Sequence, residues 1–367
     1  MMRVCHMTSA HGSQDGRIFY KECVSLAKAG YEVYEVAHGE SCEKNGVHIV
    51  GVGNEPGSRM KRMLFDAKRV YQKARELDCD IYHFHDPELL PYGLKLKKAG
   101  KKVIFDSHEN TVEQIKEKTW IPNLIRKPAY VLFDWYQKHA CARLDAVVSV
   151  TPHICDYFRA INPNTHMITN YPILAPLPEH RERKAGSMCF AGGIDVRWNH
   201  EEIIRAMETI EESSYVLCGN GKGEYFESLK ALPAWKRVDF KGRLPFDQVS
   251  AVLNTCQIGM AVLMYNNNTG FDIGTMGVTK VFEEMMLGQP IICTDFKLWK
   301  EFVERYHCGI CVKPGSVAEI ANAIRYLIDH PEEARRMGEN GRRAVEQEFN
   351  WNFEEKKLLE LYRELSA

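Results

Sequence analysis

The chain has 367 residues, a length that predicts two domains and excludes a single small binding module. Apolar residues make up 45% of it and charged residues 26%, which excludes a disordered or fibrous protein. The 48 basic and 49 acidic residues leave a net charge of −1, so the average surface offers no electrostatic reason to bind nucleic acid.

The N-terminal segment and the cysteines predict a cytoplasmic protein. The first residues turn polar after about seven positions, and no apolar run approaches the ~18 residues that span a bilayer. The twelve cysteines are scattered, mostly within apolar runs, as reduced buried cysteines are. Cys308 and Cys311 form a CxxC without a second pair, so we expect no metal site there.

Short apolar runs rich in β-branched residues alternate with longer amphipathic ones in the first half, which is typical of βα units around a parallel sheet. We expect helices over residues 17–29, 58–77 and 130–142. The expected strands are residues 3–8, 32–37, 47–52, 80–85, 102–107, 146–150 and 167–169.

The pattern pauses at a proline-rich, charged stretch and then starts again. Strands are expected at residues 187–191, 215–218, 238–241, 258–263, 290–293 and 310–312. The last part, 331–365, reads as helical with a break near Glu346 to Trp351. We therefore predict an N-terminal domain over 1–171 completed by a C-terminal helix over 350–367, a linker over 172–186, and a C-terminal domain over 187–349.

Glycine turns follow the first strands of each half, where a phosphate could approach backbone amides. The segment from His11 to Gly16 lacks the GxGxxG spacing of a dinucleotide fold. In the second half, Gly192 and Gly193 are followed by Arg197, and a guanidinium beside a glycine turn suits a diphosphate. The alternative is that these glycines only form tight βα turns.

The most informative segment runs from Gly277 to Ile292. It opens with a glycine, continues as a helix and stops at Gly288 before a buried strand. Lys280 falls in the first helical turn, which disfavours a cation, so it needs an anionic partner. Glu283, one turn later, could accept hydrogen bonds from two hydroxyls of a ribose. A solvated Lys–Glu pair is the alternative.

The run TKVFEEMMLGQPII resembles the nucleotide-binding segment of family 4 retaining glycosyltransferases. Further stretches in the same order are DGRIFYKECVSLAKAGYEV, DIYHFHDPELLPYGLKLKKAGKKVIFDSHE, FAGGIDVRWNHEEIIRAM, YVLCGNGKG and VDFKGRLPFDQVSAVLNTCQIGMAVL. The resemblance implies an α/β protein of the GT-B fold, with two Rossmann-like domains whose parallel sheets face across a cleft. It also implies sugar transfer from a UDP- or GDP-linked donor, with retention of the anomeric configuration and with no cofactor and no metal.

The resemblance places Glu283 on the donor ribose, Lys280 near the phosphates, and Arg197 near the leaving diphosphate. His85 corresponds to a histidine that lines the sugar site, and His108 ends the next strand on the same edge. We therefore expect His85, His108, Arg197 and Lys280 to be catalytic. The expected donor-binding residues are Gly12, Asp15, Gly193, Gly219, Gly221, Gly242, Asp272, Gly277, Thr279 and Glu283.

The sequence departs from the family pattern at two positions. Thr275 stands where the E-x7-E signature has its first glutamate, and Asp272 is a candidate substitute. Gly193 stands where a second basic residue is usual, which leaves diphosphate neutralisation to Arg197 and Lys280.

A basic stretch with apolar residues at helical spacing covers 57–76 and could rest on anionic lipid, or could be an ordinary surface helix. Contact with the inner face of the plasma membrane would suit a lipid-linked acceptor. The sequence thus predicts a glycosyltransferase of cell-envelope or exopolysaccharide synthesis, acting on a glycan or lipid-linked acceptor. The alternatives are a nucleotide-sugar epimerase of similar fold and a sugar-nucleotide-binding protein without turnover.

Overall fold

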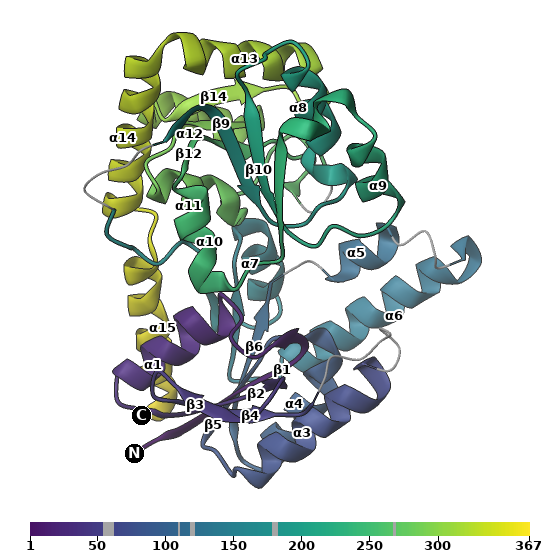
Figure 1. Cartoon of the computed structure of the whole chain (residues 1–367). Helices are drawn as coiled ribbons and strands as arrows, with labels where there is room; N and C mark the ends of the chain where they lie inside the picture. Colours follow the sequence, from purple (N-terminus) through teal and green to yellow (C-terminus); the bar gives the residue numbers. More distant parts are fainter. Residues whose placement is uncertain (54–61, 109–110, 118–121, 178–182, 267–268) are drawn as a thin grey trace. The chain divides into compact units, whose positions relative to one another are not determined.

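The computed structural model describes residues 1–53, 62–108, 111–117, 122–177, 183–266 and 269–367 (Figure 1). It divides into two compact units. Unit 1 comprises Met1–Asn170 and Asn352–Ala367, and unit 2 comprises Tyr171–Trp351. The division after residue 170 lies one residue from the boundary that the sequence predicts.

Unit 1 is built on a sheet that, in its described residues, has eight strands in the order β3-β4-β2-β1-β5-β6-β7-β8. All neighbouring pairs are parallel except β3 with β4. The strands are β1 (Arg3–Gly12), β2 (Glu32–His38), β3 (Cys42–Lys44), β4 (Val47–Gly51), β5 (Ile81–Phe84), β6 (Lys102–Ser107), β7 (Ala146–Ser149) and β8 (Thr165–Met167).

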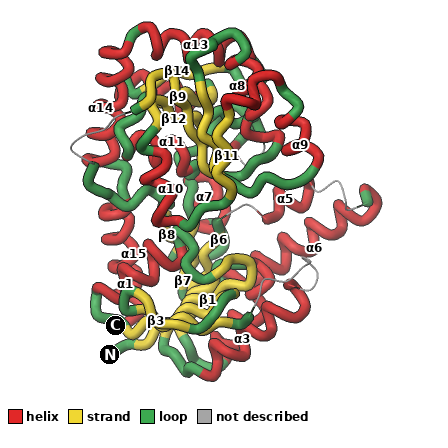
Figure 2. The backbone as a smooth tube through the Cα atoms, viewed as in Figure 1, coloured by secondary structure: helices red, strands yellow, loops and turns green. Residues whose placement is uncertain are grey.

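Helices lie on both faces of this sheet (Figure 2). They are η1 (Ile18–Cys23), α1 (Val24–Lys28), η2 (Arg62–Asp66), α3 (Ala67–Glu76), η3 (Pro87–Leu89), α4 (Leu90–Lys98), α5 (Thr111–Glu117), α6 (Asn123–Cys141), α7 (Pro152–Arg159) and α15 (Trp351–Ser366). The segments η1 and η2 are π-helical turns, whereas η3 is a 3₁₀ turn.

The two faces of the unit 1 sheet differ in chemistry because successive side chains of a strand point to opposite faces. Cys5, Met7, Tyr82, Phe84 and Phe105 join one apolar core with α3, α4, α6 and α7. The alternate residues are apolar at the beginning of these strands, as at Val4 and Ile81, and polar toward their carboxyl ends, as at His6, His83 and Asp106. The polar ones face η1 and α15, and Figure 1 shows α1, which continues η1, next to α15. One face of this sheet therefore buries apolar groups alone, and the other face, called the polar side below, also buries polar groups at the carboxyl ends of its strands.

Unit 2 has a parallel sheet of six strands among its described residues, in the order β11-β10-β9-β12-β13-β14. The strands are β9 (Lys184–Ala191), β10 (Ser214–Cys218), β11 (Val238–Gly242), β12 (Cys256–Ala261), β13 (Ile291–Thr294) and β14 (Gly309–Val312). Its helices are η4 (Val196–Trp198), α8 (His200–Met207), α9 (Glu224–Lys230), η5 (Pro233–Arg237), α10 (Phe246–Leu253), α11 (Thr279–Met286), α12 (Lys297–Tyr306), α13 (Val317–Asp329) and α14 (Pro331–Gln347).

Both faces of the unit 2 sheet are apolar. One core joins Phe190 and Leu217 of the sheet to α8, α9 and α13. The other core joins Cys189 and Cys293 to α10, α11, α12 and α14. Sheets buried on both sides leave little room for polar chemistry except at the ends of the strands.

Each strand that the sequence predicts overlaps a strand of the structure, although the one predicted at 167–169 shares only Met167 with β8, and the prediction of two Rossmann-like α/β halves is confirmed. The short antiparallel strand β3 was not predicted, because CEK is polar and exposed. The predicted linker 172–186 is wrong at its end, where Lys184 to Gly186 begin β9. Lys184 pairs with Cys256 there, although it carries no apolar signal.

The predicted helices also shift at their ends. The helix predicted over 17–29 is π-helical in its first half, and α6 begins seven residues before the predicted start at 130. Residues 58–61 of the helix predicted over 58–77 lie outside the described residues. The twelve cysteines all lie in described residues and are all free, as predicted. None of the described helices has the length and apolar character needed to cross a membrane.

The helix α15 packs on unit 1, the domain that a helix over 350–367 was expected to complete. Leu358, Leu361 and Tyr362 are fully buried. The amide of Thr169 donates to Glu354 Oε2 at 2.8 Å, which joins the first turn of α15 to the segment after β8. The last helix is thus part of the core of unit 1.

We predict that Leu361→Ala lowers the free energy of unfolding of unit 1 by about 2–5 kcal/mol, because it leaves a cavity where a buried side chain packs. Its exposed neighbour offers a matched control, since Glu360→Ala should change stability by no more than about 0.5 kcal/mol. Urea unfolding of both variants measures the difference. Equal losses would contradict the placement of α15 in the core.

Candidate functional site

Glycine turns end three neighbouring strands of unit 2. The amide of Gly192 donates to Cys218 O, and that of Gly219 donates to Gly242 O, both at 2.9 Å. A Cβ atom on Gly219 would lie 2.2 Å from the Gly192 carbonyl oxygen, so only glycine fits there. The predicted donor-binding residues Gly193, Gly219 and Gly242 therefore share one edge of the sheet.

The predicted pair on α11 lies beside the first of these turns. Lys280 Nζ is 2.8 Å from Glu283 Oε2, and the two side chains are 22% and 26% exposed. A Cβ atom on Gly192 would lie 3.2 Å from Lys280 Cε, which places this lysine directly against the turn. A cation, a carboxylate and a bare backbone therefore meet at this edge of unit 2.

The loop before α11 has Thr275 at the position where a glutamate was expected to contact the donor sugar. Thr275 is buried, and its Oγ1 accepts from the Gly277 amide at 3.1 Å. Its carbonyl accepts from Trp299 Nε1 at 2.9 Å. Thr275 thus holds the loop that leads to Thr279, the first residue of α11, and offers no charge to a ligand.

Asp272, the candidate substitute for the missing glutamate, is at the surface. Its carboxylate lies 2.9 Å from Lys297 Nζ, and this hydrogen bond lowers the pKa of Asp272. The same lysine's amide donates to the Asp272 carbonyl at 3.0 Å. Asp272 is therefore paired with the start of α12.

Arg197 lies in the short turn η4 and folds back on Asp195. Its Nε and Nη2 lie 2.9 and 2.8 Å from the two oxygens of Asp195. The side chain of Arg197 is 60% exposed, and an exposed ion pair of this kind contributes only about 0–1 kcal/mol. An anionic ligand could therefore compete for the guanidinium at little cost.

Gly221 is the predicted donor-binding glycine with the clearest packing role. A Cβ atom there would lie 2.5 Å from the ring of Phe226 and 2.7 Å from that of Phe240. Its lack of a side chain is explained by these aromatic neighbours.

Strand register assembles a second polar group, in unit 1. His6 of β1 pairs with His83 of β5, and Phe84 pairs with Phe105 of β6. Residues two positions apart share a face, so His6, His83, His85, Asp106 and His108 come together on the polar side of this sheet. All of them except His108 are buried.

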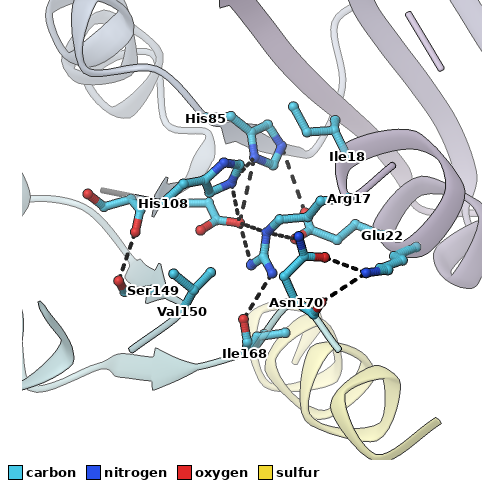
Figure 3. A network of polar contacts seen from close by, with 12 residues as sticks. Arg17, Ile18, Glu22, His85, His108, Ser149, Val150, Ile168 and Asn170 are labelled. Carbon is cyan, nitrogen blue, oxygen red and sulfur yellow. Dashed lines mark hydrogen bonds and ion pairs between the residues drawn. The ribbon is translucent and has the colours of Figure 1, made fainter. Parts of the chain in front are cut away.

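A buried arginine neutralises this group (Figure 3). Arg17 Nη2 lies 2.8 Å from Asp106 Oδ2, and its Nη1 donates to the Ile168 carbonyl at 3.0 Å. Burial alone would raise the pKa of Asp106, but the Arg17 guanidinium and His108 hold it well below its usual range. Asp106 is thus a carboxylate fixed beneath the edge of the sheet.

The two histidines predicted to be catalytic are neighbours. His85 Nδ1 lies 3.3 Å from His108 Nε2, and His108 Nε2 lies 3.2 Å from Asp106 Oδ2. Their side chains differ in exposure, 0% for His85 and 21% for His108. Burial lowers the pKa of His85 to about 4. Of this pair, His108 is therefore the member that a ligand can reach.

Gly12 ends β1, and Asp15 caps the helical segment that follows it. The Asp15 carboxylate accepts from the amides of Arg17 and Ile18 at 2.8 and 3.0 Å. Burial would raise the pKa of Asp15, but the hydrogen bond from His11 and these amide bonds hold it below its usual range. Asp15 therefore shapes the loop after β1.

Asp86 has a structural role at this edge that the sequence analysis missed. It is buried, and its Oδ2 accepts from Thr8 Oγ1 and from the amides of Ser9 and Ala10, at 2.7 to 3.1 Å. An acidic residue directly after a buried strand was the signal that could have found it. His6, Arg17, Glu22, His83, Asp106 and Tyr362 were missed as well, because their proximity depends on strand order.

Models of two glycosyltransferase families match most of the chain. Residues 16–170 match "Glycosyltransferase Family 4", and residues 179–344 match "Glycosyl transferases group 1". The uncharacterized glycosyltransferase MJ1069 of Methanocaldococcus jannaschii is 24% identical over 48% of this chain, and the chain spans only 45% of that relative. D-rhamnosyltransferase WbpZ of Pseudomonas aeruginosa is 25% identical over 90% of this chain and 91% of its own length.

Solved structures share the fold. Sucrose-phosphate synthase from Thermosynechococcus elongatus has a TM-score of 0.73 at 18% identity, with both chains fully covered. Anabaena HepE, in complex with UDP and glucose, has a TM-score of 0.70 at 16% identity and covers 99% of this chain and 100% of its own. At these identities the likeness concerns the fold alone.

The Gly193 turn is also tied to a buried histidine. His200 Nε2 donates to the Gly193 carbonyl at 3.3 Å, and its Nδ1 lies 3.0 Å from the Tyr215 hydroxyl. Burial lowers the pKa of His200 to about 4, and the bond to Gly193 only partly offsets this effect.

Between pH 6.5 and 4 the unfolded chain therefore binds more protons at His200 than the folded chain does. We predict that this residue makes the free energy of unfolding of unit 2 fall with decreasing pH across that window, by at most about 1.4 kcal/mol per pH unit. The free energy of unfolding of His200→Gln, measured at several pH values, should depend less on pH than that of the wild type. The surface variant His330→Gln should follow the wild type, and an unchanged slope in His200→Gln would contradict the prediction.

Proposed function

Because this chain belongs to the family 4, group 1 glycosyltransferases of the GT-B fold, we propose that it moves a sugar from a UDP or GDP donor to a glycan or lipid-linked acceptor, with retention of the anomeric configuration. The proposed setting is the synthesis of a cell-envelope or exopolysaccharide glycan. D-rhamnosyl transfer by WbpZ and the UDP complex of HepE support a sugar donor of this kind.

The observation that carries the proposal is the Lys280–Glu283 pair beside the Gly192 turn. A nucleotide diphosphate sugar presents a ribose with two hydroxyls and a diphosphate. A carboxylate accepts from both hydroxyls, and a lysine with bare backbone amides suits the phosphates. Glu283 and Lys280 are one helical turn apart, so one ligand could engage both when their own ion pair opens.

Arg197 and Lys280 supply the positive charge that sugar transfer needs. When the bond to the sugar breaks, negative charge develops on the leaving diphosphate, and positioned cations stabilise that charge. Two cations at the glycine-lined edge suit this role, so we propose that transfer uses no metal at the reacting centre. Lys280 and Arg197 thus act as catalytic residues.

Unit 1 contributes His108 to the proposed reaction. This side chain is partly exposed, and Asp106 beneath it holds a negative charge that Arg17 balances. An imidazole backed by a carboxylate can accept or donate a proton at a sugar hydroxyl. The buried His85 supports His108 from below instead of reaching the sugar itself.

We predict that Glu283→Gln weakens donor binding by about 10–100-fold, because a hydrogen bond to a charged group contributes about 1.5–3 kcal/mol. Thermal-shift titrations with UDP- and GDP-sugars measure affinity, and a labelled donor sugar followed into the acceptor measures transfer. Nuclear magnetic resonance of the product then gives the anomeric configuration.

The exposed residue Glu301 on α12 supplies the matched control, and Glu301→Gln should bind and transfer as the wild type does. An unchanged donor affinity in Glu283→Gln would overturn the assigned donor site. Release of a rearranged sugar without any acceptor would favour the epimerase. Binding without turnover on every acceptor would favour the non-catalytic alternative.

We further propose that unit 1 works at a membrane surface through α6. The sequence placed this contact in 57–76, of which 57–61 lie outside the described residues. The basic side chains of Lys68, Arg69 and Lys73 on α3 are exposed, but the exposed apolar surface is larger on α6. Exposed on it are Leu124 at 89%, Ile125 at 54%, Val131 at 52%, Leu132 at 66% and Trp135 at 61%.

Helices α3, α4 and α6 cover the same face of the sheet, so a basic helix and an apolar one share one layer. An anionic bilayer attracts lysine and arginine and receives leucine and tryptophan at its interface. A lipid-linked acceptor at the cytoplasmic face would be reached from such a surface.

We predict that the double variant Leu132→Ser with Trp135→Ala binds vesicles containing anionic lipid at least about tenfold more weakly than the wild type, because it removes buried apolar area from the contact. Flotation with neutral and anionic vesicles measures this. Phe353→Ala, which removes an exposed aromatic residue from α15, is the control and should bind as the wild type does. Equal binding by all three proteins would refute the surface.

A further inference from the structure

Four side chains with metal-binding atoms converge inside unit 1. We define the histidine cluster as His6, Glu22, His83 and His85, all fully buried. One ligand atom from each lies within 4.8 Å of the others. The histidines come from β1, β5 and the end of β5, and Glu22 comes from the π-helical turn η1 packed on that face.

We propose that the histidine cluster binds one zinc ion, which joins η1 to the sheet of unit 1. Zinc with ligands at about 2.0–2.1 Å holds neighbouring ligand atoms roughly 3.3 Å apart in a tetrahedron. His6 Nδ1 and His85 Nε2 are 3.0 Å apart. Glu22 Oε2 lies 3.7, 3.8 and 4.0 Å from His6 Nδ1, His85 Nε2 and His83 Nδ1. Movement of Glu22 toward the three imidazoles, and adjustment of atoms that now lie within 4.8 Å of one another, would complete the tetrahedron.

The state of Glu22 supports a cation. Neither of its carboxylate oxygens accepts a hydrogen bond from the described part of the chain. Arg17 Nε lies 3.0 Å from Oε1, but the guanidinium directs its bonds to Asp106 and Ile168. Oε1 therefore has the Arg17 cation beside it, whereas Oε2 has neither a donor nor a cation of that kind, and a metal ion at Oε2 would supply one.

The neighbours of the cluster suit a second shell around zinc. Tyr362 OH lies 3.1 Å from His6 Nε2, so it can accept the proton that His6 keeps when Nδ1 binds metal. His85 Nδ1 lies 3.3 Å from His108 Nε2, which can accept the proton that His85 keeps, with the Asp106 carboxylate 3.6 Å away. The 2.9 Å contact of His83 Nδ1 with Tyr362 would be exchanged for the metal.

Charge and backbone agree with this assignment. Arg17 lies between the carboxylates of Asp106 and Glu22, two negative groups that share one cation, and zinc would meet one of these carboxylates and three imidazoles, a common ligand set for this metal. Single π-helical turns are rare and are frequent at functional sites. The proposed ion is structural, it lies below His108, and it does not depend on the proposed transfer reaction.

The test is the metal content of the full chain. Protein from zinc-supplemented cultures, dialysed against a chelator, should hold about one zinc ion per chain by mass spectrometry, because a buried ion leaves only when the site opens. Magnesium and calcium should be absent. Cobalt-supplemented cultures should give protein with the visible absorption of tetrahedral Co²⁺.

Glu22→Gln removes the anionic ligand and keeps the shape, and should reduce bound zinc to below about a tenth of an equivalent. Tyr362→Phe keeps all four ligands and should weaken zinc binding by about 10–100-fold in competition with a chelator, without the loss of a ligand. His38→Gln alters another buried histidine of unit 1, whose Nε2 contacts Ser9 O, and should keep its zinc.

Wild-type protein with less than about a tenth of an equivalent of any transition metal would overturn the proposal. So would Glu22→Gln with the wild-type zinc content. Either result would identify the cluster as a hydrogen-bonded network that runs from Asp106 through His85 and His6 to Tyr362. Donor binding by unit 2 is measured separately, so failure here leaves the proposed function untouched.

Discussion

The buried ion pair of Arg17 with Asp106 is the interaction on which the polar side of unit 1 depends. Removing both charges from water is costly, and loss of one partner from a buried pair destabilises a protein by about 3–5 kcal/mol. The pair is stabilised here by Ile168 O and by His108, and it lies beneath the edge where β5 and β6 end. His85 and His108 are oriented by the same Asp106 oxygen.

The sheets of the two units are covered by different kinds of side chain. In unit 2 the sheet is apolar on both faces, so its chemistry lies in the turns at the ends of β9, β10 and β11. In unit 1 one face of the sheet is polar, and η1 and α15 supply the groups that this face needs. A fold duplicated along the chain therefore carries two different kinds of site.

The sequence predicted the strands well because hydrophobic periodicity decides them, and it predicted the Lys280–Glu283 pair because both residues lie on one helix. Local spacing fixes such a pair. The sequence also predicted that His85 and His108 are neighbours, since consecutive parallel strands end at the same edge. It did not distinguish their exposure, because burial of His85 depends on how Asp106 and His6 pack around it.

The histidine cluster shows why the other buried polar residues of unit 1 could not be predicted from the sequence. His83 and His85 are two residues apart, so the sequence alone places them on one face of a strand. Their nearness to His6 requires that β1 pairs with β5 in one particular register, and their nearness to Glu22 requires a π-helical turn that no propensity predicts. Tyr362 enters from a helix 279 residues away from His83. The three histidines were visible as polar residues at the apolar strand segments, and it is their conjunction on the adjacent strands β1 and β5 that makes a site.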